Sequence, residues 1–508
     1  MVPGSVRSHL GGGLLLTAVG LLISHHAGGL AAPWAFRGPA ALRGALAKQG
    51  LGLGAPAPVG SGAALVTKRP PPTAALHAAA VAATEEATLS SVPQSSVNLV
   101  KNIVGAGMLS LPAGMAAFSG SPKALEPSLV ITLFIGLISA YGFVLIADAC
   151  HRTGESTYGG AWSRTVSPGT KWLPEMACFA KAGVGCISFS MILGDCISRI
   201  LHPMGLPAIL ASRDFVILAI TTLVLFPLCM LKSLAPLAKF SVAGVMSNVY
   251  IAFFCLLRCF DGSYRPGGAF FRAAPVAPKL VATTGSAWST VLHPGFTTLL
   301  SILATAYLAH YNAPLYYQQL KPGSDGKKAG RFFLVSVLGF AASGAFFGLI
   351  MTGGFLTFGA NSSGLILNNY AAKDSLAGLA RCAICLSLIT SYPLVFFSLR
   401  KQVLDLIGQR GVDFNAERPA LTTALLLGVV TLLALSLHDL GTLAAFAGAC
   451  FGSFLIYIAP ALMVLCAQQR GIGPCPGGWR GRGQRAAQIA MLPLGAVLAV
   501  LGAIQSMK

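Results

Sequence analysis

From about Val97 onward, the chain consists of long apolar runs separated by short polar loops. Each run spans roughly 18 to 25 residues, the length at which an α-helix crosses a lipid bilayer. A membrane β-barrel would instead alternate polar and apolar residues along each strand. Only 10% of the 508 residues are charged, against about 25% in soluble domains. The sequence therefore predicts an all-α, polytopic membrane protein and excludes a soluble multidomain enzyme.

We expect about eleven transmembrane helices from these runs. Their spans centre on residues 97–118, 128–150, 176–200, 214–231, 240–260, 291–317, 332–358, 377–399, 420–437, 441–466 and 486–505. Together they predict a membrane domain over residues 94–508.

Residues 1–93 are expected to form a leader ahead of this domain. The apolar stretch Leu10–Ser24 is short for a spanning helix and fits the hydrophobic part of a signal peptide. No acidic residue occurs from there to Thr84, and Arg, Lys, Ala, Gly and Pro are frequent. That composition is typical of a transit peptide. The two parts together resemble the plastid presequence of algae with secondary plastids; the alternatives are a signal anchor and a poorly structured tail.

The net charge of +20 does not indicate a nucleic-acid partner, because the cations fall between apolar runs and flank them. More of them lie in the loops after even-numbered spans, which places the start of the first span on the cytoplasm-equivalent side. A signal peptide would carry that start into the lumen. Import into an organelle removes the conflict, so we expect a plastid envelope or another endomembrane.

The cysteines indicate neither a disulfide framework nor a metal site. Most of them lie inside the apolar runs, and the closest pair, Cys382 and Cys385, lacks the His and Cys companions of a zinc site.

The first span, SVNLVKNIVGAGMLSLPAGM, contains Gly105, Ala106 and Gly107 at mid-membrane depth, with Pro112 shortly after. Such a helix is expected to unwind. Unwound backbone inside a membrane survives where it lines a cavity, and its free amides can bind a carboxylate, an amine or an ion. The alternative is a small-residue face for helix packing.

The sixth span contains the polar and aromatic segment TAYLAHYNAPLYYQQL. His310 and Asn312 inside a bilayer are expected to face a cavity or a partner helix. His310 can relay protons or donate a structural hydrogen bond. The two interrupted spans stand five helices apart, which is the relation expected when two inverted five-helix repeats each begin with a broken helix.

Four stretches of the chain resemble the amino acid/auxin permease family of the amino acid, polyamine and organocation transporter superfamily. They are VKNIVGAGMLSLP, FPLCMLKSLAPLAKFSVAG, TAYLAHYNAPLYYQQL and ILNNYAAKDSLAGLARCAICLSLITSYPLVFFSLR. The resemblance implies a leucine-transporter-like fold with five plus five inverted helices, breaks in helices 1 and 6, and an eleventh helix. It also implies transport by alternating access, with residues 94–508 as the transporter domain.

The resemblance also implies a site. Gly105, Ala106 and Gly107 match the substrate-binding break of the family. The residues that match its facing segment, and that would surround the substrate side chain, are Tyr307, His310, Tyr311 and Asn312. Thr390 and Ser391 match the part of the eighth span where sodium-dependent relatives place hydroxyl ligands.

Lys101 departs from the family pattern, because sodium-coupled relatives tend to have Asn at this position, one turn before the break. An ammonium can replace a bound cation, and a lysine withdrawn from water can exchange protons. With Thr390 and Ser391, Lys101 is the expected ion- or proton-coupling group. The alternative is that Lys101 extends to the membrane interface.

We therefore expect a secondary transporter of small neutral amino acids that is sodium-independent and is either driven by proton symport or runs as a facilitator. The alternative is an amino-acid sensor that binds without appreciable transport. The chain has no phosphate-binding GxxxxGK[ST] loop and no arrangement of catalytic residues, so we expect no enzyme and no cofactor. The expected partners are an amino acid, protons and the lipid bilayer, with no nucleic acid.

Two further features are predicted to be structural. Arg381 begins the eighth span and is expected to anchor it at the interface. The hydrophilic segment 262–289 is expected to be a solvated loop outside the membrane.

Overall fold

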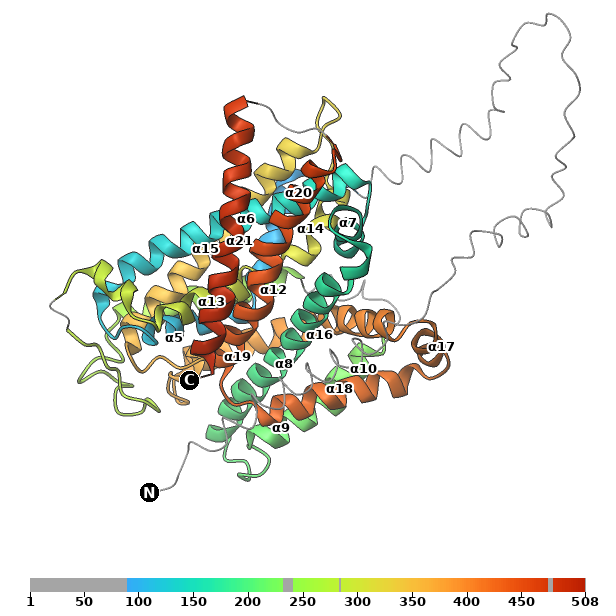
Figure 1. Cartoon of the computed structure of the whole chain (residues 1–508). Helices are drawn as coiled ribbons and strands as arrows, with labels where there is room; N and C mark the ends of the chain where they lie inside the picture. Colours follow the sequence, from blue (N-terminus) through green and yellow to red (C-terminus); the bar gives the residue numbers. More distant parts are fainter. Residues whose placement is uncertain (1–88, 232–240, 283–284, 474–477, 508) are drawn as a thin grey trace, which may run out of the picture. The chain divides into compact units, whose positions relative to one another are not determined.

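The computed structural model describes residues 89–231, 241–282, 285–473 and 478–507. In this part the chain is almost entirely helical (Figure 1). Two helical breaks, described below, interrupt its first and sixth spans. The predicted signal-like and transit-like segments lie outside the described residues. The first helix, α4, begins at Val92.

Eight helical segments of the described chain are long and apolar enough to cross a membrane, and a ninth results if the bent pair at residues 92–116 counts as one span. They are α6 (Leu125–Thr153), α8 (Trp172–Leu201), α12 (Ser241–Phe260), α15 (Ala329–Phe358), α16 (Ser375–Ile407), α18 (Pro419–Ser436), α19 (Leu440–Ala447) continuing into α20 (Ala459–Gln469), and α21 (Gly478–Ser506). The all-helical membrane prediction is confirmed, but the count of eleven is not.

Two expected spans consist of shorter pieces. Over residues 214–231 the chain forms α9 (Arg213–Ile220), a π-helical turn and α10 (Phe226–Cys229). Over residues 291–317 it forms α13 (Phe296–Ala306) and α14 (Ala313–Gln319). Short helices α7 (Tyr158–Thr165) and α17 (Gln409–Glu417) connect neighbouring spans.

The start of the first span lies beside the end of the sixth. The Ser90 N–H donates to the Gln319 carbonyl at 2.7 Å, and the Lys321 N–H donates to the Ser90 carbonyl at 3.0 Å. We call the side of the helix bundle where α4 begins the Ser90 side. Since successive spans reverse direction, α8 begins and α16 ends on this side. The opposite side, where α12 ends and α16 begins, is the Tyr264 side.

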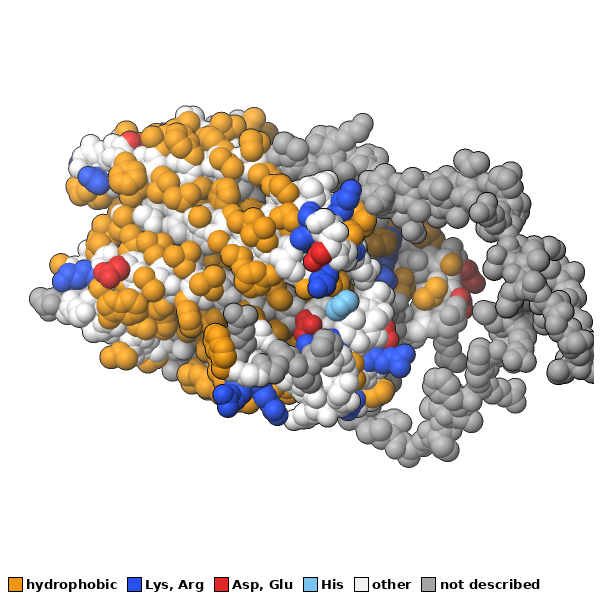
Figure 2. Space-filling view, turned by 90° about the horizontal axis from the view of Figure 1, so that it is seen from above, with side chains coloured by type: hydrophobic (Ala, Val, Ile, Leu, Met, Phe, Trp, Pro, Cys, Tyr) orange, Lys and Arg blue, Asp and Glu red, His pale blue; other side chains and the backbone are white. Residues whose placement is uncertain are grey.

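Much of the surface of the helix bundle is apolar, as contact with lipid requires. Figure 2 shows a broad field of hydrophobic side chains, with most of the visible lysine and arginine side chains gathered to one side of it. Leu133, Phe134 and Leu137 of α6, for example, are each more than half exposed. Apolar side chains at such positions avoid the cost of burying polar groups in hydrocarbon.

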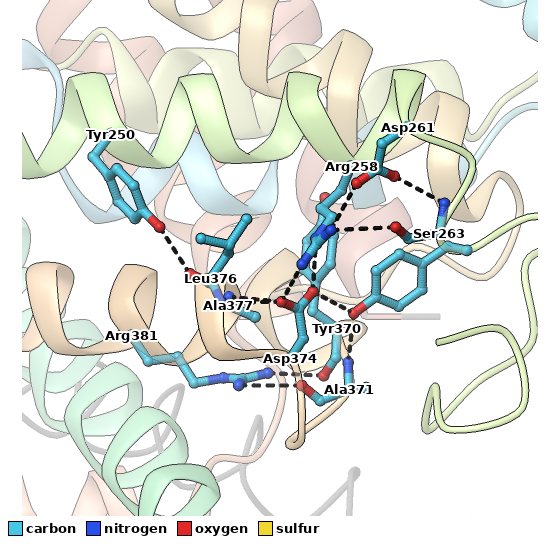
Figure 3. A network of polar contacts seen from close by, with 11 residues as sticks. Tyr250, Arg258, Asp261, Ser263, Tyr370, Ala371, Asp374, Leu376, Ala377 and Arg381 are labelled. Carbon is cyan, nitrogen blue, oxygen red and sulfur yellow. Dashed lines mark hydrogen bonds and ion pairs between the residues drawn. The ribbon is translucent and has the colours of Figure 1, made fainter. Parts of the chain in front are cut away.

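A buried polar network on the Tyr264 side ties α12 to α16 (Figure 3). Asp374 is fully buried and caps α16 by accepting from the Leu376 and Ala377 N–H groups at 3.1 and 3.3 Å. The Tyr264 hydroxyl donates to the same carboxylate at 2.9 Å. Tyr264 is 1% exposed, and burial raises the pKa of its hydroxyl above the usual range. The prediction of a solvated 262–289 loop is therefore wrong at its start.

Arg381 does not anchor α16 at an interface, as the sequence suggested. Its side chain is fully buried, and its guanidinium donates to the carbonyls of Leu367 and Tyr370 at 2.9 and 2.8 Å. It therefore satisfies the carbonyls of the turn that precedes α16, as Figure 3 shows for Tyr370.

Candidate functional site

The first span is broken where the sequence predicts it. Helix α4 (Val92–Ile103) ends, Val104 and Gly105 are extended, and the chain resumes as a 3-10 helix (Ala106–Ser110) and α5 (Leu111–Ala116) with a bend of 49°. The first hydrogen bond of the 3-10 helix runs from the Met108 N–H to the Gly105 carbonyl at 3.2 Å. The N–H groups of residues 105–107 precede it and so have no partner within this helix.

Asn248 of α12 forms a hydrogen bond with the break at its α4 end. Its side-chain amide donates to the Val104 carbonyl at 2.9 Å, which satisfies a carbonyl that an intact helix would have used. Asn248 is 6% exposed, and its Oδ1 has no hydrogen-bond partner within the described residues.

The sixth span is broken at Tyr307–Ala309, between α13 and α14. The Ala309 N–H donates to the Tyr307 carbonyl at 2.9 Å, so the chain turns tightly instead of continuing the helix. The two breaks contact each other: a Cβ at Gly107 would lie 3.1 Å from the Ala306 Cα. The free amides of the first break therefore lie close to the carbonyl end of α13.

Helix α14 also contacts α4. The Asn312 side chain donates to Asn102 Oδ1 at 3.4 Å, and the Tyr316 hydroxyl donates to the Asn98 carbonyl at 2.9 Å. These bonds join the two half-helices on the Ser90 side.

A cavity of about 560 Å³ lies at the two breaks. This volume falls within the roughly 300–1,000 Å³ of typical small-molecule sites. Helices α8 and α16 complete its wall, each through one face whose residues recur every three or four positions. Representative lining residues are Lys181, Gly185 and Ser188 of α8, and Ile384, Ser387 and Ser391 of α16.

Seven of the ten predicted site residues line this cavity: Lys101, Gly105, Ala106, Gly107, Tyr311, Asn312 and Ser391. They come from the first, sixth and eighth expected spans, which are far apart in the sequence. The fold therefore brings these seven positions around one space.

Tyr307 and His310 lie elsewhere, because the cavity-facing side of this segment is formed by Leu308, Tyr311 and Asn312. The Tyr307 hydroxyl donates to the Thr132 carbonyl of α6 at 3.1 Å, and His310 Nε2 lies 2.9 Å from the Ser139 carbonyl of the same helix. Both side chains are fully buried. Their contacts in this structure are with the neighbouring helix.

Thr390 also lies outside the cavity lining. It is next to Ser391, but one residue along an α-helix turns the side chain by about 100°. The Thr390 hydroxyl donates to the Leu386 and Ser387 carbonyls of its own helix, both at 3.0 Å.

The cavity is open toward the Ser90 side. The lining residues Asn98 and Gln319, near the start of α4 and the end of α14, are exposed. On the opposite wall, Ser110, Ile384 and Ala444 are 0%, 1% and 3% exposed. A molecule in the cavity is thus closed off from the Tyr264 side.

The chain matches the family model described as "Transmembrane amino acid transporter protein" over residues 88–506. The match covers the broken helices and every other span. The chain belongs to this family.

This amino acid transporter family member is similar to several named proteins. It is 23% identical to "Putative sodium-coupled neutral amino acid transporter 11" of Danio rerio, over 74% of this chain and 79% of the relative. It is 27% identical to "Solute carrier family 38 member 8" of Mus musculus, over 73% and 83%. It is 22% identical to "Vacuolar amino acid transporter 2" of Saccharomyces cerevisiae, over 73% and 75%.

Two solved structures are also similar to this family member. The crystal structure of MhsT in complex with L-phenylalanine has 14% identity and a TM-score of 0.47, over 80% of this chain and 98% of that chain. The inward-facing conformation of Mhp1 has 11% identity and a TM-score of 0.45, over 83% and 91%.

Sequence reasoning missed two prominent lining residues of this transporter family member. Lys181 lies within the third span, and the sequence already shows its charge inside an apolar run. Asn248 is a polar residue within the fifth span, but its role depends on α12 packing beside the first break. That contact cannot be read from local sequence.

The charged side chains that line the cavity are both lysines. Lys101 and Lys181 line it, and no Asp or Glu is among its lining residues in the described chain. The charges repel a bound cation and attract an anion, more strongly than they would in bulk water.

Proposed function

We propose that this protein transports small neutral amino acids across a membrane by alternating access. The observation that carries the proposal is the set of free backbone amides at residues 105–107, which line a cavity beside the carbonyl end of α13. Amides bind the substrate carboxylate, and carbonyls at a helix end bind its ammonium group. Every α-amino acid carries both groups.

The three residues Gly105, Ala106 and Gly107 are proposed to bind the substrate backbone, while Tyr311 and Asn312 contact its side chain. Tyr307 and His310 are proposed to have no contact with the substrate and to position the sixth-span break through their hydrogen bonds to α6. The cavity opening on the Ser90 side is the substrate path in this conformation. Alternating access then requires closure on this side and opening on the Tyr264 side.

Sodium independence and proton coupling form part of the proposal. A sodium ion would bind among lining residues that include two ammonium groups and no carboxylate within the described chain. Lys101 lies one turn before the break and is proposed to exchange protons during transport, together with the hydroxyl of Ser391. Thr390 is proposed to join them only if α16 rotates. Several relatives carry "sodium-coupled" in their names, so coupling needs a direct test.

The leader of residues 1–93 supports a plastid envelope or endomembrane location through its composition. One relative is named as vacuolar. Imaging of the full chain with a C-terminal fluorescent fusion tests the location; fluorescence at the cell surface alone would contradict it.

The test of function is uptake of labelled neutral amino acids into liposomes that contain the purified chain, with a proton or a sodium gradient imposed separately. We expect uptake that follows the proton gradient and does not need sodium. Lys101→Asn is expected to shift uptake toward sodium dependence. Sodium-driven uptake by the unmutated chain would contradict the role of Lys101, and binding without uptake would favour the sensor alternative.

A further inference from the structure

Lys181 carries a charge into the cavity without a partner to balance it. It lies nine residues after the first residue of α8, well inside the spanning segment (Trp172–Leu201). It lines the cavity, and within the described residues it has no hydrogen-bond or ion-pair partner. An unpaired ammonium inside a membrane protein is costly, and such residues commonly face a ligand or an ion path.

The neighbours of Lys181 leave room for a ligand. Ala182, Gly185 and Ser188 follow it on the cavity-lining face of α8, and all three side chains are small. Gly185 packs closely against α16, because a Cβ at this position would lie 3.1 Å from Cγ1 of Val395, which also lines the cavity. Lys181 therefore lies on a cavity-lining face of α8 that carries several small side chains beside it.

Lys181 and Lys101 lie equally far along the chain from the start of their helices. Each lies nine residues into its helix, since α4 begins at Val92 and α8 at Trp172, and both helices begin on the Ser90 side. The position of Lys101 is beside the backbone break, whereas Lys181 is on the facing helix. A ligand that lies between the break and α8 reaches both walls of the cavity.

We propose that Lys181 binds a second carboxylate of the substrate, so that the cavity accepts dicarboxylic amino acids in addition to neutral ones. This inference rests on the proposed function, because it assumes that the α-carboxylate binds at residues 105–107. The side-chain carboxylate then points across the cavity toward α8. A dicarboxylic amino acid carries one net negative charge, which balances the ammonium group of Lys181.

The same ammonium chemistry would also bind an inorganic anion such as chloride. The two sources differ in what they predict. If Lys181 binds a substrate carboxylate, its replacement impairs uptake of dicarboxylic amino acids only. If Lys181 binds chloride, uptake of every amino acid depends on chloride.

The test compares uptake of labelled L-glutamate, L-aspartate and L-alanine by liposomes that contain the full chain, in chloride and in gluconate buffers. The variants are Lys181→Met, which removes the charge, and Lys181→Arg, which keeps it. Lys171→Met is the matched control, because Lys171 is the N-cap residue of the same helix, has a side chain that is 49% exposed, and pairs with Glu175 at 3.2 Å outside the cavity. Thermal unfolding with each amino acid measures binding independently of transport.

We expect the unmutated chain to take up all three amino acids without a chloride requirement. Lys181→Met should raise the ratio of KM for glutamate to KM for alanine by about tenfold or more, as expected when one partner of a buried charge pair is removed. Lys181→Arg and Lys171→Met should keep the ratio of the unmutated chain. In thermal unfolding, glutamate should stabilise the unmutated chain but not Lys181→Met.

The inference is overturned if the unmutated chain takes up alanine but neither dicarboxylic amino acid, or if Lys181→Met changes all three alike. Chloride-dependent uptake that disappears in Lys181→Met would assign the site to an inorganic anion and also overturn it. Absence of uptake and binding for every amino acid would instead contradict the proposed function itself. Should Lys181→Met fail to fold, the unmutated chain still tests the inference, because uptake of alanine without uptake of either dicarboxylic amino acid, or uptake that requires chloride, overturns it.

Discussion

Asn248 donates a hydrogen bond of 2.9 Å to the Val104 carbonyl, and this bond joins the fifth span to the break of the first. The carbonyl would otherwise be exposed to an apolar interior without a donor. An unwound segment in a membrane depends on such substitutes for the helical bonds it has lost. The contact therefore supplies the Val104 carbonyl with a donor at the point where the helix is broken.

Replacing Asn248 should weaken both the fold and substrate binding. We expect Asn248→Ala to lower the free energy of unfolding by about 1–3 kcal/mol, because a buried carbonyl loses its donor. The KM of uptake should rise in parallel, because the break loses its fixed position. The control is Ser247→Ala, whose hydroxyl bonds to the Ala243 carbonyl of its own helix at 2.8 Å. An unchanged KM in Asn248→Ala would contradict this role.

The two glycines of the break should respond differently to alanine. A Cβ at Gly105 meets no atom within 4 Å, so Gly105→Ala should fold normally and place its methyl group in the cavity. We expect a higher KM with little change in melting temperature. Gly107→Ala instead meets Ala306 at 3.1 Å and should destabilise the protein by about 1–3 kcal/mol through overpacking. Equal melting temperatures for the two variants would show that the breaks do not touch.

Tyr307 and Tyr311 provide a test of which side chains face the substrate. Tyr307→Phe removes a hydrogen bond to the Thr132 carbonyl and should cost about 1 kcal/mol of stability without a selective effect on KM. For Tyr311→Phe, a lining residue, we expect a change in KM that differs between amino acids. The measurements are thermal unfolding in detergent and competition by a set of amino acids. Selectivity that changes with Tyr307 instead would place that side chain in the substrate path.

The Arg258 and Asp374 pair should be among the most sensitive sites on the Tyr264 side. Arg258 donates to both carboxylate oxygens, at 2.9 and 2.6 Å, and Asp374 is fully buried (Figure 3). Asp374→Asn leaves a guanidinium with a neutral partner and should cost about 3–5 kcal/mol, measured by thermal unfolding. Asp261→Asn is the control, because Asp261 pairs with the same arginine but is 25% exposed. Equal losses in the two variants would argue against a special role of burial.

Local sequence was sufficient for the membrane class and for the two breaks. Paired glycines in the first span and Pro314 in the sixth disfavour a continuous helix wherever they occur, since the effect is a property of each residue's own backbone. The membrane spans were readable for a similar reason, because hydrocarbon requires long apolar helices. The count of spans was less secure, since the fourth and sixth are divided into short helices.

Side-chain direction was beyond the reach of the sequence. His310 and Tyr311 are neighbours in one conspicuous polar segment, yet His310 bonds to α6 and Tyr311 lines the cavity. Inside a membrane a polar side chain is stable against any partner that satisfies it, so polarity alone does not tell which helix supplies that partner. Arg381 illustrates the same point, because its partners are the carbonyls of a turn.

The sequence by itself determined that this chain is a helical membrane protein with interrupted first and sixth spans, because hydropathy and backbone preference act locally. Only the tertiary structure decided that Lys181 and Asn248 share one cavity with the first-span break. Those residues meet through the packing of α8, α12 and α16. Contacts between distant segments depend on how whole helices fit together, and no short stretch of sequence specifies that fit.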